Sequence, residues 1–482
     1  MAFICISENV QPCDHSTGAE RKTMEIEEQE GYYRKPGNGL VAELLFFGAM
    51  TPENLKFMED SIRKYKINKT SLTRDGNVRV WNMKEEALNG LLADADAAGI
   101  PCQGAYVRNK IKVFSAALAG GEEKEAFDVR PYADRAREFL KDQEEKVKST
   151  HGILKFYFAG QEEDLHEVGD CDMVFVSQEE KTFRVLVRGE KGEFFTLAQK
   201  TEAGRFLSYL QVAVQLYNTG LTGETYRGAF WKAMGELEDA QRESVEVASA
   251  EVNKTGSGNF TCGPRIIKQK QEDLYAVECH HFGGIVPIAF WMKLAKAIDG
   301  YEDIVLRMDR GMNLFVCNLL AEEVHKPLDV MTEAAFTRAE KSNVSDRCGL
   351  CVHGMVDPQV FVSVLLKEMR KLRFYDGVLP TFTISGCERC CHTVPDANLV
   401  FVTQSETPEG RKPGRYCRVK LHVDGNTELG IMPQQNIAEY LMAVGAMVQS
   451  AESDFTTWYQ NNKELMVKLT GLYCQDKTEE QE

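Results

Sequence analysis

The sequence predicts an α+β protein in which one small unit occurs twice, each copy followed by a longer α/β segment. Three landmarks recur at a single offset of 235 residues: Phe47-Gly48 with Phe282-Gly283, Pro52 with Pro287, and Gly76 with Gly311. The order of the predicted elements is also the same around both sets: an apolar strand, a helix that begins at Pro, a strand after Gly, and a second helix. A shared offset together with a shared order indicates an internal duplication.

The elements of the first copy follow from local signals. Thr51, Pro52 and Glu53 predict the start of a helix, because they supply a capping hydroxyl, a proline at the first helical position and an acid in the first turn. Apolar residues then recur at helical spacing, at Leu55, Met58, Ile62 and Tyr65. The alternating residues 77–82 predict a strand, and residues 84–98 predict the second helix.

Further helices are predicted later in the chain, over residues 322–332, 436–447 and 456–470. Together these patterns divide the chain into five segments. They are a polar N-terminal extension (1–38), the first half-domain (39–105), a first α/β lobe (106–265), the second half-domain (266–340), and a second α/β lobe with the C-terminal helices (341–482).

Composition and charge exclude several classes of function. Of the 482 residues, 43 % are hydrophobic and 27 % are charged, which is typical of a globular protein of roughly three domains. No apolar run reaches the ~20 residues that span a bilayer, and the N-terminus lacks the basic flank of a secretory signal. A net charge of −16 argues against a nucleic-acid binder. The scattered cysteines suit a reducing compartment, so we expect a cytoplasmic protein.

Five of the 14 cysteines form two short clusters, Cys348 with Cys351, and Cys387 with Cys390 and Cys391. The first four of these make two CxxC pairs, a pattern of structural zinc, although the pairs lie further apart than in zinc ribbons. With Cys391 in place of Cys390, the set instead offers four thiolates to an iron–sulfur cluster. Spacing alone leaves both metals open. Glycines beside the clusters make buried free thiols the less favoured interpretation.

Several blocks of the chain resemble one known family. The blocks are Leu72 to Asn82, Tyr106-Val107-Arg108-Asn109, Phe127 to Tyr132, Lys268-Gln269-Lys270-Gln271 with Gly283-Gly284, and Ser385-Gly386-Cys387-x3-Cys391. In this order, they resemble the nitrite/sulfite reductase family, whose members carry siroheme and a [4Fe–4S] cluster. The resemblance implies duplicated ferredoxin-like half-domains and two α/β lobes of the siroheme/[4Fe–4S] type, as the duplication would require.

The resemblance also implies which thiolates hold the cluster. Cys351, Cys387 and Cys391 match three of the family's four ligands, and Cys391 would also join the cluster to the siroheme iron. Ser345 stands at the fourth position, so Cys348 would have to supply the missing thiolate. Serine oxygen is a poorer match to soft iron–sulfur chemistry than a thiolate.

The family holds its oxyanion with Arg and Lys, because cations bind the anion and feed protons as oxygen leaves as water. Arg108 and Lys155 match two of these positions. Tyr157 stands where a second Lys is expected, and apolar residues near Ala42 and Leu44 replace an Arg. The resemblance therefore implies an anion site with fewer cations than in the family.

The contacts to the macrocycle are matched in part. Thr73 and Lys270 match positions that contact siroheme. Asp75 stands where the family has an Arg, and the nearby Arg74 and Arg79 are the residues that could replace that cation. Because siroheme is a polycarboxylate, its pocket must supply positive charge.

We therefore expect a siroheme- and [4Fe–4S]-dependent reductase of a small oxyanion, sulfite or nitrite, with an external ferredoxin-like protein or flavoprotein as electron donor. The first alternative is a divergent paralogue that keeps a cluster but has lost oxyanion reduction. Such a paralogue would act on a different substrate or as a structural subunit in an oligomer. The second alternative is a zinc-stabilised scaffold that uses Cys390.

Overall fold

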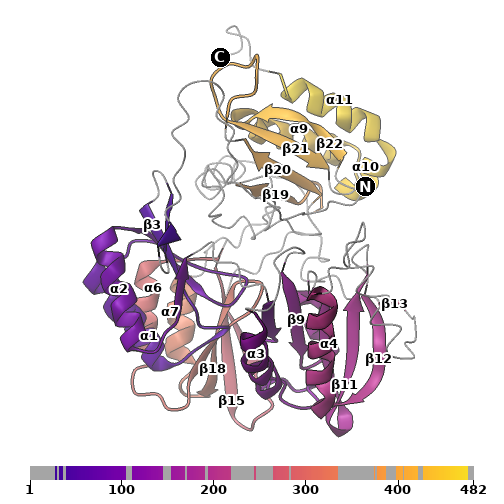
Figure 1. The fold of residues 1–482 in the computed structure, drawn as a ribbon. Helices are drawn as coiled ribbons and strands as arrows, with labels where there is room; N and C mark the ends of the chain where they lie inside the picture. The colour runs from indigo at the N-terminus through magenta and orange to yellow at the C-terminus, as the bar shows by residue number, and fades with distance from the viewer. Residues whose placement is uncertain are drawn as a thin grey trace.

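The described parts of the chain form four β-sheets with helices packed against them (Figure 1). The computed structural model describes residues 28–29, 32–35, 39–104, 111–144, 153–168, 171–189, 194–218, 244–245, 264–281, 284–334, 374, 377–386, 398–404, 406–421 and 427–475. Among these residues, no helix is both long enough and apolar enough to cross a membrane.

The first half-domain has the ferredoxin-like order of elements. Its βαββαβ series is β3 (Gly39–Leu44), α1 (Pro52–Tyr65), β5 (Thr70–Leu72), β6 (Val78–Met83), α2 (Glu85–Ala97) and β7 (Cys102–Gly104). In the sheet, β3 lies between β7 and β6, and β6 pairs with β5. Two strands from the predicted extension, β1 (Glu28–Gln29) and β2 (Tyr32–Lys35), continue this sheet beyond β3.

The local signals for α1 are confirmed. The Thr51 hydroxyl accepts from the Asn54 backbone N–H at 3.3 Å, and the Asn54 side chain accepts from the Thr51 N–H at 3.0 Å. Pro52 begins the helix, because its missing N–H would have no partner in the first turn. Leu55, Met58 and Ile62 form the buried stripe.

The second half-domain repeats this arrangement. It contains β15 (Leu274–His280), α6 (Ile288–Ala297), β17 (Val305–Met308), β18 (Asn313–Leu320) and α7 (His325–Ala334), with β14 (Arg265–Lys268) beside β15. Here β18 pairs with both β15 and β17, as β6 pairs with β3 and β5 in the first copy. The predicted α+β fold with duplicated half-domains is confirmed.

Each half-domain gives one short strand to the sheet of the other. β4 (Ala49–Met50) pairs with β17, with Met50 opposite Leu306, and β16 (Ile285–Val286) pairs with β5, with Ile285 opposite Ser71. Met50 and Ile285 are 235 residues apart, and so are Ser71 and Leu306. The register between the halves therefore obeys the offset found in the sequence.

Side chains join the two halves at the same place. The Thr70 hydroxyl donates to the Val286 carbonyl at 2.9 Å and accepts from the Trp291 indole N–H at 2.8 Å. Apolar residues of both halves form one continuous core beneath the two sheets. The landmark Gly76 is required here, because a Cβ on it would lie 2.5 Å from the Gly48 Cα, and its φ is +71°.

Where the first α/β lobe is described, it contains a six-stranded sheet and the helices α3 (Arg130–Glu144) and α4 (Phe206–Asn218). Its strands are β8 (Ile111–Ser115), β9 (Leu154–Ala159), β10 (Met173–Gln178), β11 (Thr182–Arg188), β12 (Phe194–Glu202) and β13 (Ser244–Val245). β8, β9 and β10 are mutually parallel. Phe158 and Phe175 stack at 4.9 Å in the core under α4.

The C-terminal lobe contains β19 (Phe382–Ser385), β20 (Leu399–Thr403), β21 (Tyr416–Leu421), β22 (Thr427–Pro433), α9 (Ile437–Ser450), α10 (Phe455–Asn461) and α11 (Lys463–Tyr473). The single helix predicted over 456–470 is wrong, because the chain leaves helical geometry at Asn462 (φ −133°, ψ 31°). The Asn462 side chain there donates to the Trp458 carbonyl at 2.8 Å and ends α10.

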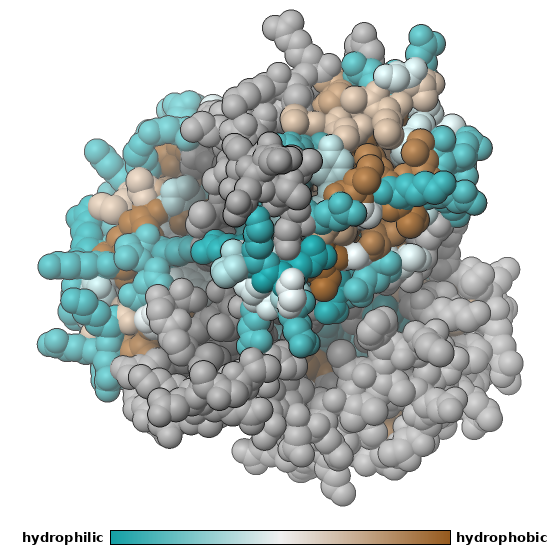
Figure 2. Space-filling model, turned by 90° about the horizontal axis from the view of Figure 1, so that it is seen from above, coloured by the Kyte–Doolittle hydropathy of each residue, from teal (hydrophilic) through white to brown (hydrophobic). Residues whose placement is uncertain are grey.

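Figure 2 shows brown apolar surface among teal polar surface on the face seen from above.

Candidate functional site

Two lysines stand side by side at the start of the parallel strands of the first lobe. Lys112 on β8 and Lys155 on β9 are register partners, so their side chains emerge on the same face of the sheet. Both side chains are half-buried. This pair, together with Asp75, Arg79 and Glu43, is called the lysine face below.

Asp75, in the turn between β5 and β6, closes the lysine face. Its carboxylate forms an ion pair with the Lys112 ammonium, and the two side chains are only 26 % and 22 % exposed. Burial alone would raise the pKa of Asp75, but Lys112, with Lys155 and Arg79, outweighs burial and lowers it. Asp75 is therefore ionised and neutralises part of the positive charge.

A buried network fixes the turn that carries Asp75. Glu43 is 2 % exposed and accepts from the Arg79 Nε and the Asn77 Nδ2, each at 2.8 Å. The Asn77 Oδ1 accepts from the backbone N–H groups of Phe46 and Phe47, each at 3.1 Å. Thr73 is buried in the same turn, where its hydroxyl accepts from the Asn77 N–H at 3.1 Å. The charges of the face are thus held on rigid backbone.

Beyond the lysines, the same face of the strands is closed by apolar and aromatic groups. Tyr157, two residues after Lys155, is fully buried and donates to Glu167 at 2.9 Å. Burial, and then Glu167, raise the pKa of Tyr157. The Arg310 guanidinium stacks on the Phe114 ring at 4.4 Å and donates to the Glu167 carbonyl at 2.9 Å. The position where a second Lys was expected is therefore part of the core.

The structure brings some predicted residues together and separates another. Thr73, Arg79 and Lys155 lie around the turn of Asp75. The Lys270 ammonium instead donates to the Glu125 carbonyl at 2.9 Å, and Glu125 packs against Gly160. Gly160 lies five residues along the chain from Lys155, which is about 16 Å on an extended strand. The contact predicted between Lys270 and a macrocycle stays a prediction.

The predicted metal ligands and one predicted cation lie outside the described residues. They are Cys348, Cys351, Cys387, Cys390, Cys391, the replaced position Ser345, and Arg108. Within the described ranges, no group of three or more His, Cys, Asp or Glu side chains is arranged to hold a metal ion. β19 carries the chain to Gly386, immediately before Cys387.

Sequence reasoning missed Lys112. Its place beside Lys155 depends on the parallel pairing of β8 with β9, which lie on either side of α3 in the chain. The local signal was a Lys between Ile111 and Val113, which alone indicates only a strand with one polar face.

Comparison with known proteins bears on the fold alone. A solved structure of the NirA protein of Mycobacterium tuberculosis matches with a TM-score of 0.58 and 13 % identity, over 85 % of this chain and 84 % of that one. The chain shares this fold. A structure of dissimilatory sulfite reductase I matches with a TM-score of 0.33 and 9 % identity, over 42 % of this chain and 69 % of that one. No family model and no curated protein matches the sequence.

The charges of the lysine face limit what it can hold. Arg79, Lys112 and Lys155 supply three positive charges, and Glu43 and Asp75 remove two, which leaves one positive charge. A half-buried face on which these five residues carry more positive than negative charge fits a small oxyanion. These five residues do not by themselves balance the carboxylates of a siroheme macrocycle.

Proposed function

We propose that the chain reduces a small oxyanion, sulfite or nitrite, as a divergent relative of the siroheme- and [4Fe–4S]-dependent reductases. The observation that carries the proposal is the pairing of Lys112 with Lys155, the residue that the sequence resemblance matches to a cation of the family's oxyanion site. The fold shared with the NirA protein over most of both chains supports it.

In this proposal the lysine face binds substrate and delivers protons. The Lys155 ammonium holds an oxyanion oxygen, and its donors are suited to pass a proton to that oxygen as it leaves as water. Lys112 stands beside it but shares its charge with Asp75. Arg108 is proposed as a third cation.

The cofactors are proposed from the sequence resemblance. Cys348, Cys351, Cys387 and Cys391 are the proposed ligands of a [4Fe–4S] cluster. Siroheme is proposed beside it, with Thr73 and Arg79 on one side and Lys270 as a further contact. When bound, these groups supply electrons one at a time from an external ferredoxin-like or flavoprotein donor. We place the protein in the cytoplasm.

One observation favours a second candidate, the paralogue without oxyanion reduction. The Asp75 carboxylate pairs with the Lys112 ammonium and takes the place that a substrate anion would otherwise have. A site neutralised in this way suits a neutral substrate, or a chain that keeps its cluster for a structural or electron-transfer role in an assembly.

Purification without oxygen, followed by measurement of iron, sulfide and zinc and by a visible spectrum, tests these candidates. Siroheme bands with a cluster, together with sulfite- or nitrite-dependent oxidation of reduced methyl viologen, are the expected result. A cluster without siroheme bands or activity supports the paralogue. Zinc in place of iron supports the scaffold that uses Cys390.

A further inference from the structure

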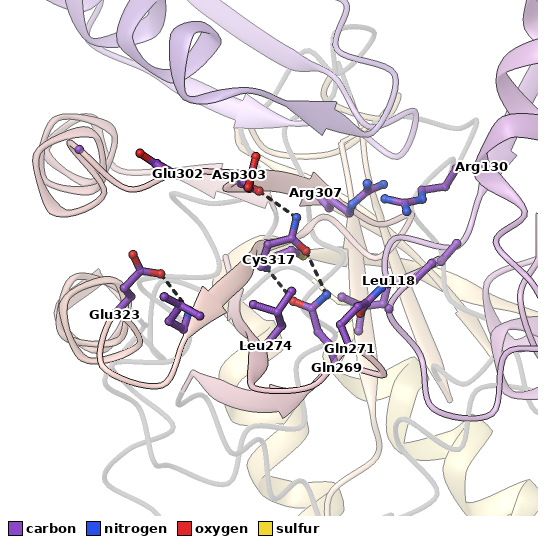
Figure 3. Close-up of a pocket in the computed structure, with 16 residues that line it drawn as sticks. Leu118, Arg130, Gln269, Gln271, Leu274, Glu302, Asp303, Arg307, Cys317 and Glu323 are labelled. Atoms are coloured by element: carbon purple, nitrogen blue, oxygen red, sulfur yellow. Dashed lines mark hydrogen bonds between the residues drawn. The ribbon is translucent and has the colours of Figure 1, made fainter.

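A second polar pocket lies between the first lobe and the second half-domain. It has a volume of about 530 Å³, within the usual range for small-molecule sites. Its walls come from the loop after β8, the start of α3, the β14–β15 turn, and the ends of β17 and β18 (Figure 3). From Lys112, β8 runs on to Ser115, and the loop after it reaches the pocket at Leu118, so the pocket lies beyond the opposite end of that strand, which is about 10 Å from Lys112.

One end of the pocket is basic. The Arg130 and Arg307 guanidinium groups lie next to each other (Figure 3). Arg130 is held by Asp128, to which it donates through Nε at 2.8 Å and through a terminal nitrogen at 2.7 Å. Within the described ranges, the Arg307 guanidinium forms no hydrogen bond and no ion pair in direct contact, although Asp128 and Asp134 lie near enough to attract it. Burial, and then Arg130, lower the pKa of Arg307, so this end of the pocket favours a negative group.

The wall between the two ends is fixed in advance. The Asn318 backbone N–H donates to the Gln269 side chain at 2.7 Å, and the Gln269 amide donates to the Asn318 side chain at 3.1 Å. Asn318, with φ +66°, also donates to the Asp303 carbonyl at 2.9 Å. Gln271 donates to the Gly120 carbonyl across the pocket. These bonds tie both walls together, so the pocket does not need to form around a ligand.

The other end of the pocket is acidic. Glu302 and Glu323 lie on the side away from the two arginines (Figure 3). One Glu323 oxygen accepts from the Leu320 N–H at 2.8 Å, which holds that carboxylate at the rim. A ligand that carried negative charge at both ends would be repelled here.

We propose that this pocket binds an elongated small-molecule zwitterion, with its carboxylate on Arg307 and its ammonium group at Glu302. Arg130 is already held by Asp128, so the one charge of the Arg307 guanidinium matches that of a carboxylate better than that of a phosphate dianion. The planar guanidinium fork can take both carboxylate oxygens at once. The ammonium group pairs with the carboxylates at the rim, and the amide wall excludes wider molecules.

Three probes of one chain length test the assignment: 6-aminohexanoate, hexanoate and hexylamine. Their binding to the intact protein is measured by saturation-transfer NMR titration. We expect millimolar binding of 6-aminohexanoate, weaker binding of hexanoate, and the weakest binding of hexylamine. Equal affinity for hexylamine and hexanoate, or no binding of any probe, would overturn the proposal.

Two variants assign the two ends of the ligand. Arg307→Gln is expected to weaken both carboxylate probes by about tenfold or more, the usual loss for a charged hydrogen bond. Glu302→Gln is expected to leave hexanoate unchanged and to remove the preference for 6-aminohexanoate. Arg135→Gln, at an exposed position of α3 outside the pocket, is the matched control and should change nothing.

The folding of each variant is checked by circular dichroism. If Arg307→Gln does not fold, Arg307→Lys replaces it, with Arg135→Lys as its control. Lys keeps the charge but loses the fork, so carboxylate binding should still weaken several-fold. Wild-type affinity in a folded Arg307 variant would show that the carboxylate binds elsewhere.

Discussion

Replacing Asp75 by Asn should strengthen oxyanion binding. The substitution preserves the shape of the side chain but removes the carboxylate that pairs with Lys112. Among the charged groups of the lysine face, three cations would then stand against Glu43 alone. The net charge of the face rises from one to two positive charges.

The size of the effect follows from Coulomb's law. A unit charge about 6 Å from a bound anion contributes about 2.8 kcal/mol at an effective dielectric constant of ~20. Both side chains of the pair are about a quarter exposed, so solvent and salt reduce this to about 1–2 kcal/mol. A gain of that size lowers KM by about 5- to 30-fold.

The assay is the steady-state KM for sulfite and for nitrite, with reduced methyl viologen as donor and at constant ionic strength. Asp60→Asn, which removes an exposed carboxylate from α1, is the control and should leave KM unchanged. Added salt should reduce the gain in the Asp75 variant. An unchanged or higher KM in folded Asp75→Asn protein would refute the reasoning, because Lys112 would then need its carboxylate partner to serve the site.

Three further predictions concern stability, each measured by urea unfolding. Burial, then Asp164 and Glu125, raise the pKa of Glu122 to about 9, so the folded state keeps a proton on Glu122 that the unfolded state releases. The free energy of unfolding should therefore fall as pH rises from about 4.5 to 9. The variant Glu122→Gln should not show this fall. Burial lowers the pKa of His281 to about 3, so the folded protein should lose stability as pH falls from about 6.5 to 3, and His281→Leu should remove that loss. Asn77→Ala leaves two backbone N–H groups without their acceptor and should cost about 2–5 kcal/mol, against less than about 1 kcal/mol for the exposed Asn461→Ala.

Local signals predicted local structure well. The cap at Thr51 and the proline after it fix the start of α1, because both act within one turn of helix. The repeated glycines and prolines predicted the duplication, although their contacts are not identical in the two halves. Gly76 is required for its close approach to Gly48, whereas a Cβ on Gly311 would meet the side chains of Asp309 and Asn313. Pro52 is the first residue of α1, and Pro287 immediately precedes α6. Asn462 shows where apolar spacing fails to predict a helix end. The apolar spacing continues through Asn462, but the backbone leaves helical geometry there and separates α10 from α11.

The site depended on contacts that local patterns do not contain. Lys155 could be found by resemblance, whereas Lys112 needed the register of two strands separated by a helix. The sequence showed that Asp75 stands in place of the family's Arg, but it did not show the ion pair of Asp75 with Lys112. Tyr157 occupies a predicted cation position, and only its contact with Glu167 shows that it belongs to the core.

The exchange of β4 and β16 has a consequence for synthesis on the ribosome. The hydrogen bond from Thr70 to Val286 joins residues 216 positions apart. The edge of β5 therefore stays unpaired until the ribosome has added that length of chain and β16 has been made. At the usual rates of translation, the wait is roughly 10–40 s. An unpaired strand edge invites association with other nascent chains during that time. Slower elongation between the two halves should therefore increase aggregation in the cell without changing the stability of the finished protein.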